Sequence, residues 1–166
     1  MKRELTTLLA SAFTVAALVI AMLAMTSPAI ADGAKQISGV GFWPGPGECT
    51  DPQGDGSSYA VKMTGDLKGC HYTFVETSVC SPSGTYREAG TEIFVDKDGG
   101  GSFKTTYTFE AKYQDCANAV GEIFGRCQHP IVPGSGTGIY AGFTGRLDFK
   151  DDIEAGNFPY KGHLQP

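Results

Sequence analysis

The segment 102–113 alternates between apolar and polar side chains more regularly than any other part of the chain. Phe103 and Tyr107 fall on one parity, whereas Lys104 and Thr108 fall on the other. A period of two residues is typical of a β-strand with one buried face. Alternation, or a high content of β-branched and aromatic residues, predicts seven further strands. They span residues 37–43, 58–64, 70–79, 85–96, 122–132, 138–151 and 157–164.

Short connections rich in glycine separate the predicted strands after residue 58. Short connections join neighbouring strands as hairpins, so the strands form an antiparallel meander. Because eight is an even number, the last strand can lie antiparallel to the first and close the sheet. We therefore predict an all-β fold, an eight-stranded antiparallel up-and-down barrel. Such a barrel is just wide enough inside for side chains or one small ligand.

The first 31 residues differ in composition from the rest of the chain. A short basic start precedes an almost wholly apolar run over 8–25, and the small residues Ala29 and Ala31 follow it. This order is typical of a secretory signal peptide, so we predict cleavage near Ala31 and export to the periplasm or the extracellular space. Only an uncleaved segment would anchor the chain in a membrane. The rest is predicted to be one disulfide-stabilised domain, with an irregular segment and one short strand over 32–57 and the barrel body over 58–166.

The charge of the chain gives no sign of a nucleic-acid partner. The formal net charge is −5 at pH 7, and lysine and arginine form no run after residue 31. Binding to a phosphate backbone depends on clustered basic side chains. We therefore expect no nucleic-acid partner.

All five cysteines follow the predicted signal peptide. An exported chain meets an oxidising compartment, where disulfides are the default. Strand direction places Cys49, Cys80 and Cys116 near one end of the barrel, and Cys127 on the strand that rises from that end. Cys70 borders a turn at the other end. We therefore predict the disulfides Cys116–Cys127 and Cys49–Cys80, with Cys70 as the odd thiol.

The three histidines, His71, His129 and His163, stand in no sequence pattern typical of catalysis or metal binding. Cys127 and His129 share one face of a strand, too far apart for a direct hydrogen bond. We interpret this pair as half of a cystine and a surface histidine. The segment 96–101 resembles the start of a calcium loop but lacks the closing glutamate, so we interpret it as a hairpin turn. No metal, cofactor or catalytic residue is predicted.

The run GTGIYAGFTG over 136–145 resembles the G-T-G-x-[FY]-x-G-x-x-G run of allene-oxide-cyclase-like and dirigent-like barrels. Many secreted bacterial proteins share this run, and the resemblance covers the last third of the chain. It implies a calycin-like, eight-stranded antiparallel barrel with a cavity, often as a homo-oligomer. The glycines suit tight turns and close strand bends. No catalytic residue of the plant cyclases or of the dirigent proteins maps onto this chain, so the resemblance implies no activity.

Most aromatic side chains occupy the apolar parities of the predicted strands, where they would either fill the barrel or line a pocket. The candidates for a ligand pocket are Tyr107, Phe109, Phe143, Phe149, Glu76 and Glu92. We expect the protein to bind a small apolar or amphipathic ligand, or to serve as an exported interaction module. One alternative is an isomerase or cyclase in which Glu76, Glu92 or Tyr107 steers charge inside an apolar cavity. The other is a structural protein of the cell envelope.

Overall fold

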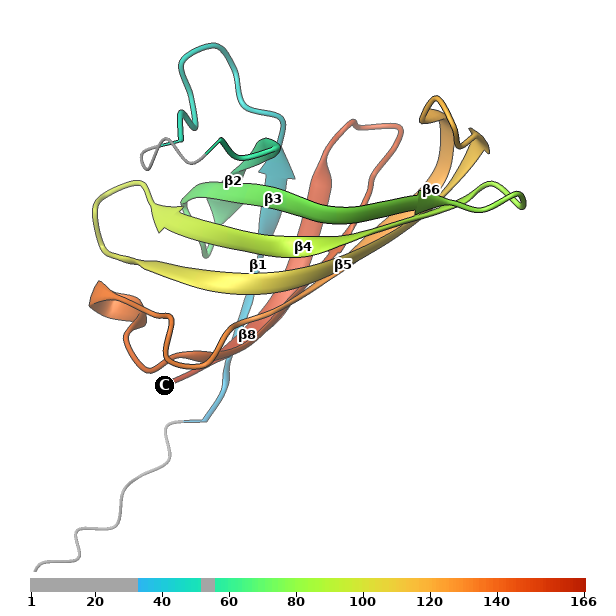
Figure 1. Cartoon of the computed structure of the whole chain (residues 1–166). Coiled ribbons are helices and arrows are strands. Elements are labelled where there is room, and N and C mark those ends of the chain that lie inside the picture. The colour runs from blue at the N-terminus through green and yellow to red at the C-terminus, as the bar shows by residue number, and fades with distance from the viewer. Residues whose placement is uncertain (1–32, 52–55) are drawn as a thin grey trace, which may run out of the picture. The chain divides into compact units, whose positions relative to one another are not determined.

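A computed structural model describes residues 33–51 and 56–166, which form a closed antiparallel β-barrel (Figure 1). Each strand pairs with the next along the chain, and β8 pairs with β1. The strands are β1 (Lys35–Phe42), β2 (Tyr59–Gly65), β3 (Gly69–Cys80), β4 (Thr85–Asp96), β5 (Ser102–Asp115), β6 (Val120–Pro130), β7 (Thr144–Lys150) and β8 (Phe158–Gln165). The predicted all-β, eight-stranded antiparallel barrel is confirmed.

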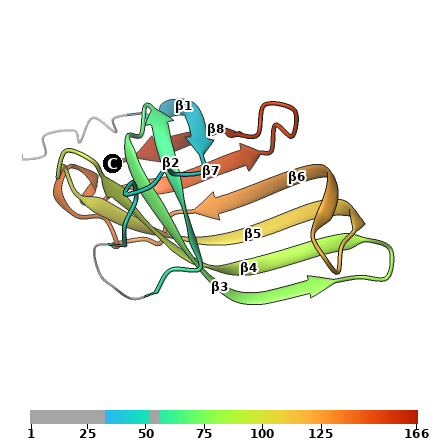
Figure 2. The ribbon, with the colours of Figure 1, turned by 90° about the horizontal axis from the view of Figure 1, so that it is seen from above.

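The two ends of the barrel differ because its strands differ in length. Strands β3 to β6 are 11 to 14 residues long, whereas β1, β2, β7 and β8 have 7 or 8 residues. Figure 2 shows β3 to β6 continuing past the shorter strands on one side of the barrel. We call this the open end; it carries the loops 81–84, 116–119 and 151–157. The closed end carries the turns 66–68 and 97–101 and the segment 131–143.

Large apolar side chains fill the half of the barrel at the closed end. Phe94 and Phe103 stack with ring centroids 5.0 Å apart, and Tyr140 packs edge-on against both. The core cluster consists of Ile37, Met63, Leu67, Phe94, Phe103, Ile131, Tyr140, Leu147, Phe149, Tyr160 and Leu164. Burial of so many large side chains is the main source of the stability of the barrel. The interior is therefore filled at this end.

The predicted strand over 138–151 begins too early. Residues Gly138–Tyr140 form a single 3₁₀ turn, and β7 starts only at Thr144. Gly138 and Gly142 have φ values of +58° and +83°, which interrupt an extended chain. The alternation expected before Thr144 is consequently wrong: Ile139 is 64% exposed, whereas Tyr140 is buried.

The predicted disulfide Cys49–Cys80 is wrong, because Cys49 pairs with Cys70 at a Cα–Cα distance of 5.4 Å. We expected the loop after β1 to stay at the end of the barrel, but it folds back along the outside of β2 and β3. Glu48 binds Lys62 at 2.5 Å, and the Tyr72 hydroxyl donates to the carbonyl of Thr50 at 2.8 Å. Cys70 is therefore not the odd thiol.

The predicted disulfide Cys116–Cys127 is also wrong, because Cys116 pairs with Cys80, at a Cα–Cα distance of 5.8 Å. This bond ties the end of β3 to the loop after β5 at the open end. Cys127 is the free cysteine, and its side chain packs against the interior cluster. Burial raises the pKa of its thiol, which therefore stays protonated at neutral pH.

Two disulfides in one small barrel indicate an oxidising environment. The predicted signal peptide over 1–31 lies outside the described residues. Among the described residues, no helix is long and apolar enough to cross a membrane.

Candidate functional site

The open half of the barrel encloses a cavity of about 570 Å³. Its aromatic lining consists of Trp43, Tyr59, Tyr86, Phe109, Tyr113, Phe149 and Phe158. Its acidic lining consists of Glu88, Glu92, Glu122, Asp151 and Asp152. None of the described residues that line it is a lysine or an arginine. The barrel is thus filled at one end and hollow at the other.

A buried carboxylate, Glu92, lies at the floor of the cavity. Thr73, Glu92 and Thr105 lie directly opposite one another on β3, β4 and β5, so their inward side chains meet. The Thr73 hydroxyl donates to Glu92 Oε1 at 3.1 Å, and the Thr105 hydroxyl donates to Oε2 at 2.7 Å. Glu92 is only 2% exposed, so it depends on these donors in place of water.

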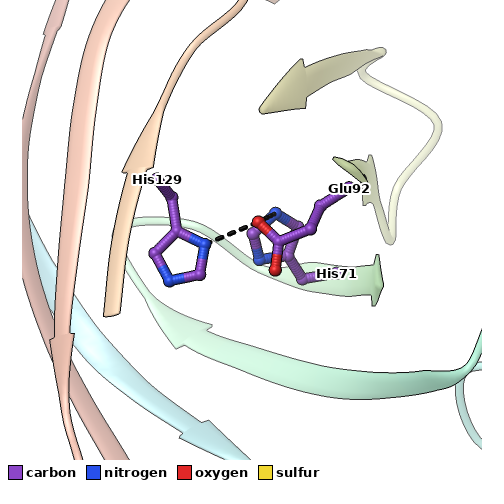
Figure 3. Close-up of side chains that lie close together, drawn as sticks. All are labelled: His71, Glu92 and His129. Atoms are coloured by element: carbon purple, nitrogen blue, oxygen red, sulfur yellow. Dashed lines mark hydrogen bonds and ion pairs between the residues drawn. The ribbon is translucent and has the colours of Figure 1, made fainter. Parts of the chain in front are cut away.

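Two histidines complete the surroundings of Glu92 (Figure 3). His129 Nδ1 lies 2.5 Å from Glu92 Oε2, and His71 Nε2 lies 3.4 Å from the same oxygen. Burial by itself would raise the pKa of Glu92, but the two histidines and the hydrogen bonds outweigh burial and hold it at about 2. Burial lowers the pKa of His71 to about 4. Glu92 is therefore a carboxylate at neutral pH; His129 Nδ1 can donate to it, and His71 Nε2 can donate to the Thr105 hydroxyl at 3.3 Å.

The second nitrogen of His129, Nε2, is turned away from Glu92 (Figure 3). It is buried and has no hydrogen-bond partner among the described residues. The ring lies between aromatic neighbours, with centroids 6.1 Å from that of Tyr107 and 4.6 Å from that of Phe149. His129 lines the cavity, so this site holds a polar atom that lacks a partner.

His71, Glu92 and His129 are also the described residues that could hold a metal ion. Their ligand atoms all lie within 4.8 Å of one another. Two imidazoles and one carboxylate are a donor set found with zinc and with non-haem iron. A metal ion would have to displace the proton between His129 Nδ1 and Glu92 Oε2. These two atoms are already hydrogen-bond partners of each other.

Three tyrosines surround a second carboxylate, Glu88, in the cavity wall. Its oxygens accept hydrogen bonds from Tyr59 at 3.0 Å, from Tyr107 at 2.7 Å and from Tyr86 at 2.6 Å. Burial and the neighbouring Glu88 raise the pKa values of all three tyrosines, whose hydroxyls remain protonated donors. These bonds hold the aromatic rings of the wall in fixed positions.

Glu122 and Asp151 form a pair of carboxyl groups over Gly125. A side chain at Gly125 would collide with one oxygen of each group, so the glycine makes room for the pair. Burial, with Glu122 alongside, raises the pKa of Asp151 to about 7. Glu122 Oε1 is buried and has no hydrogen-bond partner among the described residues. The Asp151 carboxyl therefore keeps its proton to a higher pH than usual.

Replacing Asp151 by asparagine is expected to stabilise the protein at pH 8. A folded-state pKa of about 7, above the ordinary 3.8, means that the stabilising contribution of this carboxyl is complete below pH 3.8 and is lost as the pH rises through 7. An amide avoids this loss and can donate to Glu122. Because Asp151 is partly solvated, we expect a gain of about 1–2 kcal/mol in the free energy of unfolding at pH 8.

Urea denaturation of D151N and of the unmodified protein at pH 5 and pH 8 checks this gain. Asp152→Asn is the matched control, since Asp152 is exposed and only caps the turn through the amide of Ala155. The difference between D151N and the unmodified protein should be larger at pH 8. A difference that is equal at both pH values would contradict the raised pKa of Asp151.

The predicted pocket residues divide between the two halves of the barrel. Phe109, Phe149 and Glu92 line the cavity, whereas Tyr107 lies behind the wall with its hydroxyl on Glu88. Phe143 packs against the closed-end core instead, where it meets Tyr140. Glu76 is exposed beside a β-bulge between Val75 and Thr77, so its predicted inward position is wrong.

Neither histidine of the floor is predicted as a site residue from the sequence. The interpretation of His129 as a surface residue is wrong, because it is only 5% exposed. Parity could have found it, since His129 shares its strand face with the inward Cys127. His71 likewise shares a face with the inward Thr73. Spacing along the chain alone could not show that these strands bring both rings to Glu92.

Comparisons with protein-family models, with curated proteins and with solved structures found no match.

Proposed function

We propose that the protein binds a small apolar or amphipathic molecule in the open half of its barrel. The observation that carries this proposal is the cavity of about 570 Å³, which joins an aromatic wall to a buried polar floor. Ligand sites typically have volumes of about 300–1,000 Å³, with mostly apolar walls and a few fixed polar groups. The hydrogen bonds of Glu88 and Glu92 keep this wall and floor in place without a ligand.

A neutral dye, N-phenyl-1-naphthylamine, tests this proposal. Trp43 is the only tryptophan of the chain, lines the cavity and is 59% exposed, so a dye bound there should quench its fluorescence by energy transfer. Val61 also lines the cavity, and Val61→Phe should fill it and weaken dye binding at least about tenfold. Val79→Phe, on an exposed position of β3, is the matched control. Dye binding that V61F leaves unchanged would overturn the proposal.

We also propose that the protein works outside the cytosol as a secreted or envelope-associated barrel. The two disulfides support an oxidising compartment, and the first 31 residues have the composition of a signal peptide. A calycin-like barrel of the allene-oxide-cyclase type remains part of this proposal through the glycine run over 136–145. Mass spectrometry of the exported protein should find an N-terminus near Asp32.

A second candidate is an isomerase or cyclase that acts in the same cavity. The observation that favours it is the pair of Glu92 and His129. A carboxylate that accepts from Nδ1 orients the ring, and the unpartnered Nε2 is free to take a proton from a ligand and return it. A ligand recovered from the native protein should then gain deuterium when incubated with the protein in heavy water. His129→Gln should abolish this exchange and leave dye binding intact.

A further inference from the structure

We infer that the ligand is an organic cation, an amphipathic molecule whose ammonium group binds Glu122 and Asp151 while its apolar body packs on the aromatic wall. This inference rests on the proposed function and names the class of its ligand. The charges, an unpartnered carboxylate oxygen and the aromatic rings of the cavity support it.

The charge of the cavity selects against anions. Five carboxyl groups line it, and no lysine or arginine among the described residues does. A concave site with walls of low dielectric focuses the field of such charges. An anionic ligand would add like charge to an acidic site, whereas a cationic ligand would neutralise part of it.

The carboxyl groups of the cavity do not all need a ligand. Glu92 accepts from two threonines and faces two histidines, and Glu88 accepts from three tyrosines. Glu122 and Asp151 form no ion pair with a basic side chain among the described residues. This pair is therefore the position where a cation gains the most.

The acidic pair offers an unpartnered acceptor to a ligand. Glu122 Oε1 is buried and has no hydrogen-bond partner among the described residues. An ammonium group has only donors, so it matches what this lining lacks. The raised pKa of Asp151 is consistent with this, because without a cationic ligand a bound proton neutralises this carboxylate.

Aromatic rings stand beside the acidic pair. Burial, and next to it the charges of Glu122 and Asp151, raise the pKa of Tyr113 to about 12. Tyr113 also packs edge-on against Tyr86, whose ring packs against Phe109, at centroid distances of 6.0 and 6.1 Å. The faces of aromatic rings attract ammonium groups, most strongly where water is scarce. Carboxylates and aromatic faces together form a site typical of organic ammonium ligands.

Three probes with one phenylbutyl body and different charges test the inference: 4-phenylbutylamine, 4-phenylbutanol and 4-phenylbutyrate. Titration calorimetry at pH 8 measures each dissociation constant. We expect the amine to bind at least about tenfold more tightly than the alcohol, and the carboxylate to bind most weakly. The double variant Glu122→Gln/Asp151→Asn should remove the preference for the amine and leave the affinity for the alcohol unchanged within about twofold. Asp98→Asn, which removes an exposed carboxylate from the closed-end turn 97–101 away from the cavity, is the control and should keep the preference.

The outcomes separate this inference from the proposed function. If the alcohol or the carboxylate binds as tightly as the amine, and V61F weakens that binding, the cavity binds ligands but the cation inference is overturned. The same holds if the dye binds and none of the three probes does. If the double variant retains the preference for the amine, the acidic pair is not the ammonium site and the inference is overturned. If neither the dye nor any probe binds, both proposals fail.

Discussion

Replacing Glu92 by leucine is expected to lower the free energy of unfolding by about 3–5 kcal/mol at pH 7. Leucine fits the space but accepts no hydrogen bonds. Thr73 and Thr105 would each lose their acceptor, and the buried His71 and His129 would lose the carboxylate that both face. Unpaired polar groups in a dry interior carry the full cost of desolvation.

The effect of the Glu92 substitution should depend on pH in one direction. The folded-state pKa of Glu92 is about 2, below the ordinary 4.5. The stabilising contribution of this carboxylate is therefore present above pH 4.5 and is lost as the pH falls towards 2. Urea denaturation at pH 7 and pH 3 should show the gap between E92L and the unmodified protein becoming smaller in acid.

Two further variants distinguish the role of the buried network from a general effect of losing a charge. Glu92→Gln keeps one acceptor and should cost less than leucine. Glu76→Leu removes an exposed carboxylate from the neighbouring strand β3 and should change stability by less than about 0.5 kcal/mol. Equal losses for E92L and E76L would contradict the role assigned to Glu92.

Replacing Cys80 and Cys116 by serine is expected to lower the free energy of unfolding by about 4 kcal/mol, because the disulfide closes a loop between residues 36 apart in the sequence. The disulfide Cys49–Cys70 joins residues only 21 apart, so its replacement should cost about 3 kcal/mol. Chemical denaturation of both double variants measures these losses.

The two disulfides should also differ in their effect on the cavity. Cys116 lines the cavity, whereas Cys49–Cys70 fastens a loop to the outer side of the barrel. Loss of Cys80–Cys116 should weaken binding of the naphthylamine dye, and loss of Cys49–Cys70 should not. Peptide mapping without reduction that found Cys127 bonded to one of these four cysteines would contradict the disulfide assigned to that cysteine.

The sequence predicts the barrel well because its evidence is local. The alternation in β5 and the short turns on either side of β4 are each visible within about a dozen residues, and pairing neighbours in order closes the sheet. The start of β7 is the exception. There the sequence still alternates between apolar and polar residues, but Gly138 and Gly142 have positive φ angles. These angles turn the chain out of the extended conformation that a strand needs.

The site is harder to predict because it depends on register and on folded-back loops. Glu92 meets Thr73 and Thr105 only through the pairing of three strands, and His129 reaches it from a fourth strand across the interior. Parity alone brings Glu92 inward but does not choose its partners. The Cys49–Cys70 disulfide depends on a loop without any period, whose path no strand pattern fixes.

In the hollow end of this barrel, we expect a cationic ligand to lie between the acidic pair and the aromatic wall. A crystal structure of the full barrel with 4-phenylbutylamine is the decisive test. We expect the amine nitrogen within about 3 Å of carboxylate oxygens of both Glu122 and Asp151, with the phenyl ring against the aromatic lining. A probe bound elsewhere, or an open half collapsed onto itself with no space for the probe, would contradict it.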